Sequence, residues 1–332
     1  MSSSLSVSVA LCTFNGSAFI EEQLVSVLEQ SEPPAEIVVS DDSSNDSTLA
    51  VVSRVFGDWR TRHPGVPLEL KILRNPVGLG VVANFEQALG ACTGDLLALC
   101  DQDDRWHPRR LERMAREFER RPSLTLLHSD ARLIDGDGQP LGLTLFQTLG
   151  VTDAVKRVEH GGRAFELLLR RNIVTGATTM LRRALFERSR PFPDAWVHDE
   201  WLAMTAAIGG GVDVLDEELV DYRQHGGNQI GVTTLDINGR AGRLRAPRTL
   251  RNERLLARAE ALAERAPLLV PEPAPDVIRA VTEKRAHEQA RSMLPAARML
   301  RGVPVLREWC TGRYSRFGRG AQDVLRDLVQ PV

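Results

Sequence analysis

The sequence predicts an α/β fold, in which helices cover both faces of a mostly parallel sheet, followed by a C-terminal helical appendage. Two observations support this prediction. In the first third of the 332 residues, Val- and Leu-rich runs typical of buried strands alternate with segments whose apolar residues recur at helical spacing. Repeated strand–helix units imply a largely parallel sheet with helices on both faces. Beyond Gly239 the composition turns to Arg, Ala and Leu, which favours helices.

The first third is expected to contain four strands and three helices. Ser17 is a candidate N-cap for the first helix, which ends at Pro33 and Pro34, and Asp46 is a candidate N-cap for the second. Because parallel sheets bind ligands at the carboxyl ends of their strands, the polar clusters that follow these strands are candidates for a site. The strands are expected at 5–11, 37–40, 68–73 and 95–100, and the helices at about 20–28, 49–56 and 81–89.

The later elements are expected to mix helices with a hairpin. Pro108 is expected to begin a helix. In chain order there follow a strand at 124–128, a hairpin of strands 131–134 and 141–143 around the turn 135–138, a helix near 165–170 and an apolar stretch at 173–181. In the appendage we expect a buried stripe of Leu250, Leu255, Leu256 and Leu262, opposite a solvated face of Arg251, Arg254, Arg258 and Arg265.

The charge distribution is uneven along the chain. A formal net charge of −2 gives no nucleic-acid signature. From Gly239 onward, however, there are 19 Lys and Arg against 10 Asp and Glu, so that the front is acidic and the tail basic. An acidic front suits a metal site, and a basic tail suits an anionic partner or membrane surface, although such charges more often only solvate helix faces.

Nothing in the sequence predicts export or membrane insertion. The N-terminus lacks the basic and apolar stretches of a signal peptide, and no apolar run is long enough to span a bilayer. The four cysteines show no metal-ligand or redox spacing, and three lie in apolar surroundings typical of buried reduced thiols. We therefore expect a cytoplasmic protein.

Three carboxylates follow the fourth predicted strand, in the run Cys-Asp-Gln-Asp-Asp-Arg-Trp. Asp101, Asp103 and Asp104 would repel one another strongly without a counterion. A hard divalent cation such as Mg²⁺ or Mn²⁺ binds oxygen ligands and can clamp a diphosphate, which makes this cluster a candidate metal site. The alternative is an acidic loop that caps the following helix.

Polar residues after the other strands are suited to a nucleotide. Asp41 and Asp42 could hydrogen-bond a base or ribose, although a double Asp after a strand also occurs in response-regulator receivers. Phe14, between Thr13 and Asn15, could lie against a base, with Thr13 donating a hydrogen bond. Arg74 could reach a phosphate, or could simply belong to a turn.

Two further segments carry groups for proton transfer or metal binding. His198, Asp199 and Glu200 precede an apolar helix, where a carboxylate could act as a general base, or Asp199 could only cap the helix. His225 follows a predicted strand and could complete a metal site, although a lone histidine is more often a satisfied surface or core residue.

Taken in order, these segments resemble the family 2 glycosyltransferases, and most closely their bacterial rhamnosyltransferase-like branch. The resemblance covers roughly Leu5 to Gly231. Its matching segments are Val9 to Gly16, Val38 to Ser44, Arg74 and Asn75 with Gly78 and Asn84, Cys100 to Trp106, Thr175 to Thr178, His198 to Ala203, and Tyr222 to Gly226. Glu200 and Gly227 depart from that branch, on the side of the acceptor.

The resemblance implies a GT-A fold (Rossmann-like), a nucleoside-diphosphate sugar donor, a divalent metal and inversion at the anomeric carbon. It implies that Asp199 is the catalytic base. Donor binding would fall to Thr13, Phe14, Asn15, Asp41, Asp42, Arg74, Asn75, Asp101 and Gln102; metal binding to Asp101, Asp103, Asp104 and His225; and the acceptor side to Trp106, Gly176, Ala177, His198, Glu200 and Trp201.

The same resemblance divides the chain into a catalytic domain at 1–238 and a helical extension at 239–332. The nucleotide-binding half would occupy about 1–105 and the acceptor half 106–238. The leading donor is dTDP-rhamnose, followed by UDP-hexoses, and glycan, lipid-linked and protein acceptors all stay open. The rival interpretations are a sugar-phosphate nucleotidyltransferase, which normally has a basic Gly-rich loop after its first strand, and a non-catalytic sugar-binding protein.

Overall fold

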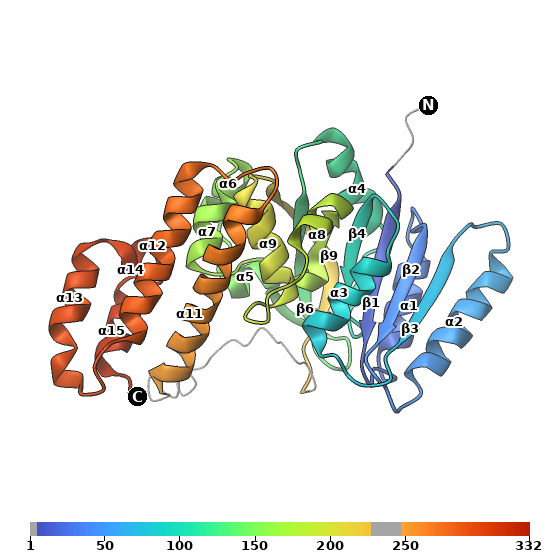
Figure 1. The fold of residues 1–332 in the computed structure, drawn as a ribbon. Helices are drawn as coiled ribbons and strands as arrows, with labels where there is room; N and C mark the ends of the chain where they lie inside the picture. The colour runs from blue at the N-terminus through green and yellow to red at the C-terminus, as the bar shows by residue number, and fades with distance from the viewer. Residues whose placement is uncertain (1–4, 227–246) are drawn as a thin grey trace.

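The computed structural model describes residues 5–226 and 247–332, and its centre is one nine-stranded sheet (Figure 1). The strand order is β3-β2-β1-β4-β8-β6-β9-β5, with β7 paired to β6. The strands are β1 (Val7–Thr13), β2 (Glu36–Asp41), β3 (Glu69–Arg74), β4 (Leu96–Cys100), β5 (Arg105–Trp106), β6 (Leu126–Ile134), β7 (Pro140–Thr144), β8 (Thr179–Arg182) and β9 (Val212–Arg223).

Helices surround this sheet and continue beyond it to the C-terminus. The α-helices are α1 (Ile20–Leu28), α2 (Thr48–Arg62), α3 (Val81–Ala91), α4 (Arg110–Arg120), α5 (Leu145–Leu149), α6 (Asp153–His160), α7 (Ala164–Arg170), α8 (Arg183–Ser189), α9 (His198–Ile208), α11 (Arg248–Arg265), α12 (Pro275–Ser292), α13 (Gly302–Cys310), α14 (Arg313–Phe317) and α15 (Ala321–Val329). Three short 3₁₀ helices are η1 (Gly176–Thr178), η2 (Ala266–Leu268) and η3 (Arg298–Leu300).

The strand directions bring distant segments to one edge of the sheet. β1 pairs in parallel with both β2 and β4, so that these three strands end together near Thr13, Asp41 and Cys100. β8 runs antiparallel to β4, which puts its first residue, and η1 just before it, at that same edge. β6 and β9 run parallel to each other, and β6 is also antiparallel to β8, so β9 ends at this edge too.

The two faces of the sheet are buried under different helices, as predicted. Alternate side chains of β1 show this division, because successive residues of a strand point to opposite faces. Val9 and Leu11 belong to a core cluster with residues of α1, α2 and α4, whereas Ala10 and Cys12 belong to a cluster with residues of α3, α8 and α9. The expected α/β class with a mostly parallel sheet is therefore confirmed.

Local corrections concern the helix starts and the hairpin. The N-cap of α1 is Phe19, and that of α2 is Ser47, neither with a side-chain capping bond. Ser17 instead donates its backbone N–H to Asp46, whose other carboxylate oxygen accepts the backbone N–H of Thr48. The predictions of Ser17 and Asp46 as N-caps are thus wrong by one or two residues, although Asp46 still serves the start of α2. The strand expected at 124–128 and the first hairpin strand form the single strand β6.

The C-terminal segment is helical, as expected, and it shares a hydrophobic core with the helices that precede it. Leu262, Ala280, Val281 and Phe317 belong to the same buried cluster as residues of α7 and α9. In Figure 1 the helices α11 to α15 lie on the side of the sheet opposite α2. The predicted domain boundary at 238/239, and Gly227, lie outside the described residues.

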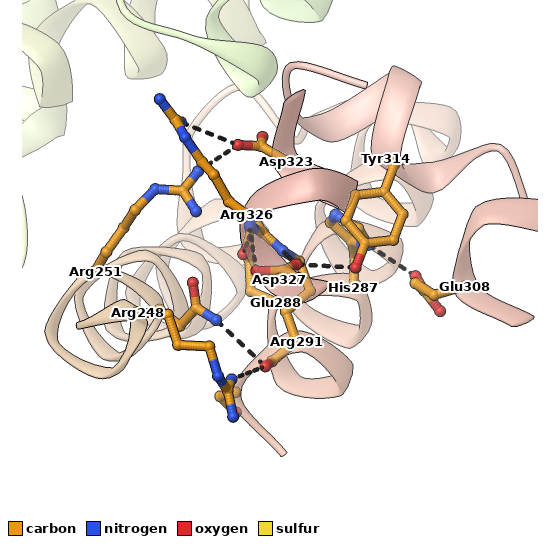
Figure 2. A network of polar contacts seen from close by, with 12 residues as sticks. Arg248, Arg251, His287, Glu288, Arg291, Glu308, Tyr314, Asp323, Arg326 and Asp327 are labelled. Carbon is orange, nitrogen blue, oxygen red and sulfur yellow. Dashed lines mark hydrogen bonds and ion pairs between the residues drawn. The ribbon is translucent and has the colours of Figure 1, made fainter. Parts of the chain in front are cut away.

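The predicted faces of α11 are only partly correct. Leu262 is buried, but Leu250 is 75% exposed. Arg251 forms an ion pair with Asp323 and Arg258 forms one with Glu200, so these two arginines do not line a solvated face. Figure 2 shows Arg251 within a wider polar network, at whose centre buried Arg291 pairs with Asp327.

Within the described part of the chain, no helix is both long and apolar enough to cross a membrane. All four cysteines are free thiols, and Cys12, Cys92 and Cys100 are buried as predicted. Burial raises the pKa of the Cys92 thiol to about 12, so this thiol stays protonated and unreactive near neutral pH.

Candidate active site

The ends of β1 and β4 are joined through Gln102. Its side-chain carbonyl accepts the backbone N–H of Phe14 at 2.9 Å, and its amide donates to the Phe14 carbonyl at 3.0 Å. A Cβ atom on Gly16 would lie 2.0 Å from Gln102 Oε1, so only glycine leaves room for this pairing. The Phe14 ring itself is 44% exposed, which leaves it available to lie against a base.

Asp41 lies beneath this loop and is fully buried. Its carboxylate accepts hydrogen bonds from the Thr13 hydroxyl at 2.8 Å, from the Ser44 hydroxyl at 2.6 Å and from the Ser44 backbone N–H at 2.9 Å. The Ser44 hydroxyl in turn accepts the backbone N–H of Asn15, an exposed residue with a positive φ of 47°. Asp41 and Thr13 therefore shape the loops, while Asn15 lies at their surface.

Asp42 binds the loop that follows β3. Its carboxylate accepts the backbone N–H groups of Leu79 at 2.6 Å and Gly80 at 2.9 Å, and the side-chain amide of Asn75 at 3.2 Å. Asn75 is buried within a hydrogen-bonded cluster, whereas Arg74, the last residue of β3, is exposed. Among the predicted donor contacts on this loop, Arg74 is thus the side chain free to reach a phosphate.

The three carboxylates after β4 occupy unequal environments. Burial, followed by the charges of Asp103 and Asp199, raises the pKa of Asp101 to about 7. Burial, with the charges of Asp103 and Asp101, also raises the pKa of Asp104 well above its usual range. Asp104 Oδ1 accepts the backbone N–H of Arg223 at 2.9 Å, but the buried Oδ2 has no hydrogen-bond partner among the residues that the structure describes. A positive charge beside such a buried carboxylate stabilises its ionised form.

His225 is brought to this cluster by the end of β9. Its Nε2 lies 2.8 Å from Asp103 Oδ2, and its ring lies 4.6 Å from the ring of Phe19 between centroids. Phe19 was not among the predicted site residues, because an aromatic residue before a helix has no distinguishing pattern. The structure therefore brings His225 into contact with Asp103, in the run of residues that also carries Asp101 and Asp104.

The chemistry of these side chains fits a hard divalent cation. Asp104 Oδ2 has no hydrogen-bond partner among the described residues, and burial raises the pKa of Asp101. Both observations indicate carboxylates that a nearby cation would stabilise. No three His, Cys, Asp or Glu side chains converge on one point among the residues that the structure describes. A Mg²⁺ site can use only one or two carboxylates, with substrate phosphates supplying further ligands.

One positive charge lies below the carboxylates and was missed by the sequence analysis. Arg110 is fully buried, with its guanidinium 3.8 Å from the ring centroid of Trp106. Burial lowers its pKa to about 10, against the opposing effects of Cys100, Asp104 and Asp101. It stays charged at neutral pH. Its position in the first turn of α4 resembles that of many exposed arginines, so no sequence signal distinguishes it.

Asp199 lies in the first turn of α9, facing η1. Its Oδ2 accepts the backbone N–H of Gly176 at 2.8 Å. Burial raises its pKa, while the N–H groups of Gly176 and Glu200 oppose that shift. The N-cap of α9 is Val197, so Asp199 is not the capping residue. The charge of Asp199 acts on Asp101, which comes from a strand end about a hundred residues earlier.

His198 is buried beside Asp199 without hydrogen bonds from its ring. The ring is stacked on Phe85 at 4.0 Å between centroids, and both ring nitrogens lack hydrogen-bond partners among the described residues. Burial lowers its pKa to about 3, which keeps the ring neutral. A Cβ on Gly176 would lie 3.1 Å from His198 Nε2, so the glycine permits close contact between η1 and α9.

The remaining residues predicted on the acceptor side are Trp106, Ala177, Trp201 and Glu200. Trp106, Ala177 and Trp201 are buried, and the indole N–H of Trp201 donates to the Ser189 carbonyl. All three belong to the hydrophobic core clusters of the fold. Glu200 is partly buried and forms an ion pair with Arg258 of α11, a partner beyond the recognisable motifs.

Known proteins resemble this chain in sequence and in fold. Residues 8–190 match the sequence model of the family "Glycosyl transferase family 2". An uncharacterized Mycobacterium tuberculosis protein, Rv1520, is 29% identical over 225 residues, which are 66% of this chain and 59% of that protein. An uncharacterized glycosyltransferase of Nostoc, alr2836, is 25% identical over 229 residues, covering 68% of this chain and 66% of its own length. The matched part of this chain thus spans about three fifths of the mycobacterial relative.

Solved structures share the fold. The crystal structure of Staphylococcus aureus TarS 1–349 in complex with UDP-GlcNAc superposes with a TM-score of 0.57 and 17% identity, over 86% of this chain and 72% of that one. The mannosyltransferase PcManGT from Pyrobaculum calidifontis, in complex with GDP-Man and Mn²⁺, superposes with a TM-score of 0.54 and 19% identity. This match covers 94% of this chain and 77% of that one. At these identities the likeness establishes the GT-A fold alone.

Proposed function

Because this chain belongs to glycosyl transferase family 2, we propose that it transfers a hexosyl group from a nucleoside-diphosphate sugar to an acceptor hydroxyl, with inversion at the anomeric carbon. The observation that carries the proposal is the meeting of Asp199 with the carboxylates that follow β4. Asp199 accepts the backbone N–H of Gly176 in η1, which directly precedes β8 at the end of the sheet where the neighbouring strand β4 also ends. The proposed base and the carboxylates proposed to hold a cation therefore lie at the same end of the sheet.

Donor binding is proposed for the loops after β1, β2 and β3. The exposed ring of Phe14 would lie against the base, and Asn15 and Arg74 would offer hydrogen-bond donors to the ribose or diphosphate. Thr13, Asp41, Asp42, Asn75 and Gln102 would act mainly by fixing these loops through the hydrogen bonds described above.

Asp101, Asp103, Asp104 and His225 would hold a divalent metal, Mg²⁺ or Mn²⁺. When bound, such a cation neutralises negative charge on a departing nucleoside diphosphate. The cation would stabilise the ionised forms of Asp104 and Asp101 most, because burial raises the pKa of both carboxyl groups. Arg110 supplies a fixed positive charge beneath the same cluster.

Asp199 is proposed as the general base. Its raised pKa makes it a stronger base than a surface carboxylate, and the Gly176 N–H fixes the direction of its Oδ2. As the acceptor oxygen attacks the anomeric carbon, its proton passes to Asp199, and the bond to the diphosphate oxygen breaks. Attack from the face opposite the leaving group inverts the anomeric centre, and no covalent intermediate is required. His198, Gly176 and Glu200 would border the acceptor.

The donor sugar, the acceptor, the cellular location and the domain division are also proposals. dTDP-rhamnose is the first candidate and UDP-hexoses the second, with a glycan or lipid-linked acceptor in polysaccharide synthesis. We propose a cytoplasmic location, because four free cysteines fit a reducing compartment. The division into a catalytic domain at 1–238 and an extension at 239–332 is likewise proposed.

A panel assay tests this function. The protein is incubated with dTDP-rhamnose, UDP-glucose, UDP-GlcNAc and GDP-mannose, with Mn²⁺ or with EDTA, and released nucleoside diphosphate is measured. We expect metal-dependent hydrolysis of one donor, since water can replace the acceptor. Parallel reactions with nucleoside triphosphates and sugar 1-phosphates detect pyrophosphate, whose release would instead identify a nucleotidyltransferase. Binding of a donor without any turnover would identify a non-catalytic protein.

A further inference from the structure

The outer face of η3 and α13 is apolar and open to solvent. Met299 lies in η3, just before α13, and Val303 and Leu306, three residues apart, lie along one side of α13. They are 96%, 80% and 62% exposed. Val305 and Glu308, on the opposite side of α13, are buried. The apolar stripe therefore points away from the protein rather than into its core.

Neighbouring apolar side chains widen the stripe into a surface. Met293 precedes it, Leu300 lies within it and Trp309 flanks it, each 47–72% exposed. In Figure 1, α13 is at the end of the molecule farthest from α2, on the outer side of the C-terminal helices. Large exposed apolar side chains that gather in this way mark an interaction site, whereas scattered ones do not.

The charge around this surface is of one sign. Between Gln289 and Gln322 the sequence contains seven arginines, of which Arg291 and Arg301 are buried, and one acidic residue, Glu308. Glu308 is buried and hydrogen-bonded to His287, as Figure 2 shows, so it presents no negative charge at the surface. Arg298 and Arg307, by contrast, are exposed beside the stripe. The surface thus combines protruding apolar side chains with positive charge.

We propose that this α13 surface (Met293, Met299, Leu300, Val303, Leu306 and Trp309, with Arg298 and Arg307) docks the protein onto an anionic phospholipid bilayer. Apolar side chains of an amphipathic helix enter the boundary between headgroups and acyl chains, while arginines bind lipid phosphates. This docking does not depend on the proposed glycosyl transfer. It would hold the protein at a membrane whether or not its acceptor is lipid-linked.

Two other arrangements fit the observations less well. In a two-fold dimer through this surface, the same patch would face itself, and the arginines of both copies would meet without exposed carboxylates to pair with them. A membrane face on α11, which its arginine spacing had suggested, is weakened because Arg251 and Arg258 are already paired with Asp323 and Glu200. The basic, apolar surface lies on α13 instead.

Vesicle flotation with the full-length chain tests the proposal. We expect binding to phosphatidylcholine vesicles containing phosphatidylglycerol, weaker binding in high salt, and little binding to pure phosphatidylcholine. Val303→Glu with Leu306→Glu should reduce binding by about tenfold or more, because charged side chains cannot enter the acyl region. Leu268→Glu is the matched control. It adds a charge at a 71% exposed leucine near the other end of the 18-residue α12, which is roughly 27 Å long.

The outcomes separate the alternatives. Retention of wild-type binding by the double variant, or absence of wild-type binding to anionic vesicles in low salt, would overturn the proposal. A concentration-dependent dimer that the double variant abolishes, without vesicle binding, would overturn it in favour of a second copy. Donor hydrolysis in solution is measured for the same variants and should stay within about twofold of wild type, since α13 is remote from the carboxylate cluster. A failure of docking is therefore distinguishable from a failure of the proposed function.

Discussion

Glu200 of α9 forms an ion pair with Arg258 of α11, so the helix that carries Asp199 is braced by the C-terminal segment. The Arg258 guanidinium also lies 4.1 Å from the ring centroid of Trp196, and its backbone carbonyl accepts the Trp196 indole N–H at 3.0 Å. Burial raises the pKa of Glu200, and the Arg258 charge opposes that shift. The C-terminal helices thus contribute directly to the surroundings of the proposed base.

Arg258→Met should lower turnover by about tenfold while leaving donor KM nearly unchanged. Loss of the guanidinium leaves Glu200 without its partner, at a cost of roughly 2 kcal/mol, and loosens the start of α9. Arg258→Lys should recover part of the turnover, and Arg279→Met, on the exposed side of α12, should resemble wild type. A fall in stability without any change in turnover would show that Arg258 only supports the fold.

Gly16→Ala should weaken donor binding and lower the stability of the fold moderately. The added methyl group must displace Gln102, whose side chain would lose its two hydrogen bonds to Phe14, at a net cost of about 1–2 kcal/mol. Isothermal titration with the nucleoside diphosphate should show at least a severalfold loss of affinity. Gly57→Ala is the control, because its Cβ would meet nothing within 4 Å. Unchanged affinity in Gly16→Ala would remove the Phe14 loop from the donor site.

Asp103→Asn should abolish metal-dependent binding of the nucleoside diphosphate while leaving the fold intact. Asp103 contacts His225 and adds to the negative charge on Asp101 and Asp104, so its neutralisation relieves repulsion in the metal-free protein. In a thermal-shift experiment, Mn²⁺ with nucleoside diphosphate should raise the Tm of wild type, and EDTA should remove that increase. The variant should show no increase. An equal increase in both proteins would place the metal elsewhere.

His198→Phe should stabilise the protein, most strongly in acid. In the folded wild type the pKa of His198 falls from 6.5 to about 3, whereas the unfolded chain keeps the ordinary value. Below pH 6.5 the unfolded state therefore takes up a proton that the folded state refuses, and stability falls as the pH drops toward about 3. This penalty is about 2 kcal/mol at pH 5.

The phenylalanine variant removes both the penalty and the two unpartnered ring nitrogens, while keeping an aromatic ring against Phe85. Urea unfolding at pH 7 and pH 5 measures the difference. An equal loss of stability in both proteins between these two pH values would contradict the low pKa of His198. If turnover also falls, His198 contacts substrate, as its predicted place on the acceptor side requires.

Much of this fold could be predicted because its first four strands are buried on both faces or bounded by clear polar loops. β1, β2 and β4 were each located to within two residues from apolar runs alone. The same loops brought the carboxylates to one edge, since parallel strands end together. The helix starts were less predictable, because Ser17 and Asp46 use their polar groups to bind each other across two loops rather than to cap their own helices.

The remaining errors involve partners that are distant in sequence. Arg251 and Asp323 are 72 residues apart, and nothing local indicates that they meet. Trp201 lies in a helix that is buried on nearly all sides, so its helical position could not tell an inward from an outward side chain. The role of Asp41 was likewise hidden, because a carboxylate that binds a loop and one that binds a ligand look the same in sequence.

The most direct test of the central claim is the turnover of Asp199→Asn on the donor that the wild-type protein hydrolyses, or transfers to its acceptor. The substitution keeps the size of the side chain and removes its basicity, so nucleoside-diphosphate affinity should stay within about twofold, while turnover at saturating donor should fall about 10²–10⁴-fold. Turnover equal to wild type would contradict the assignment of the base. Lost affinity with unchanged turnover at saturation would make Asp199 a donor ligand.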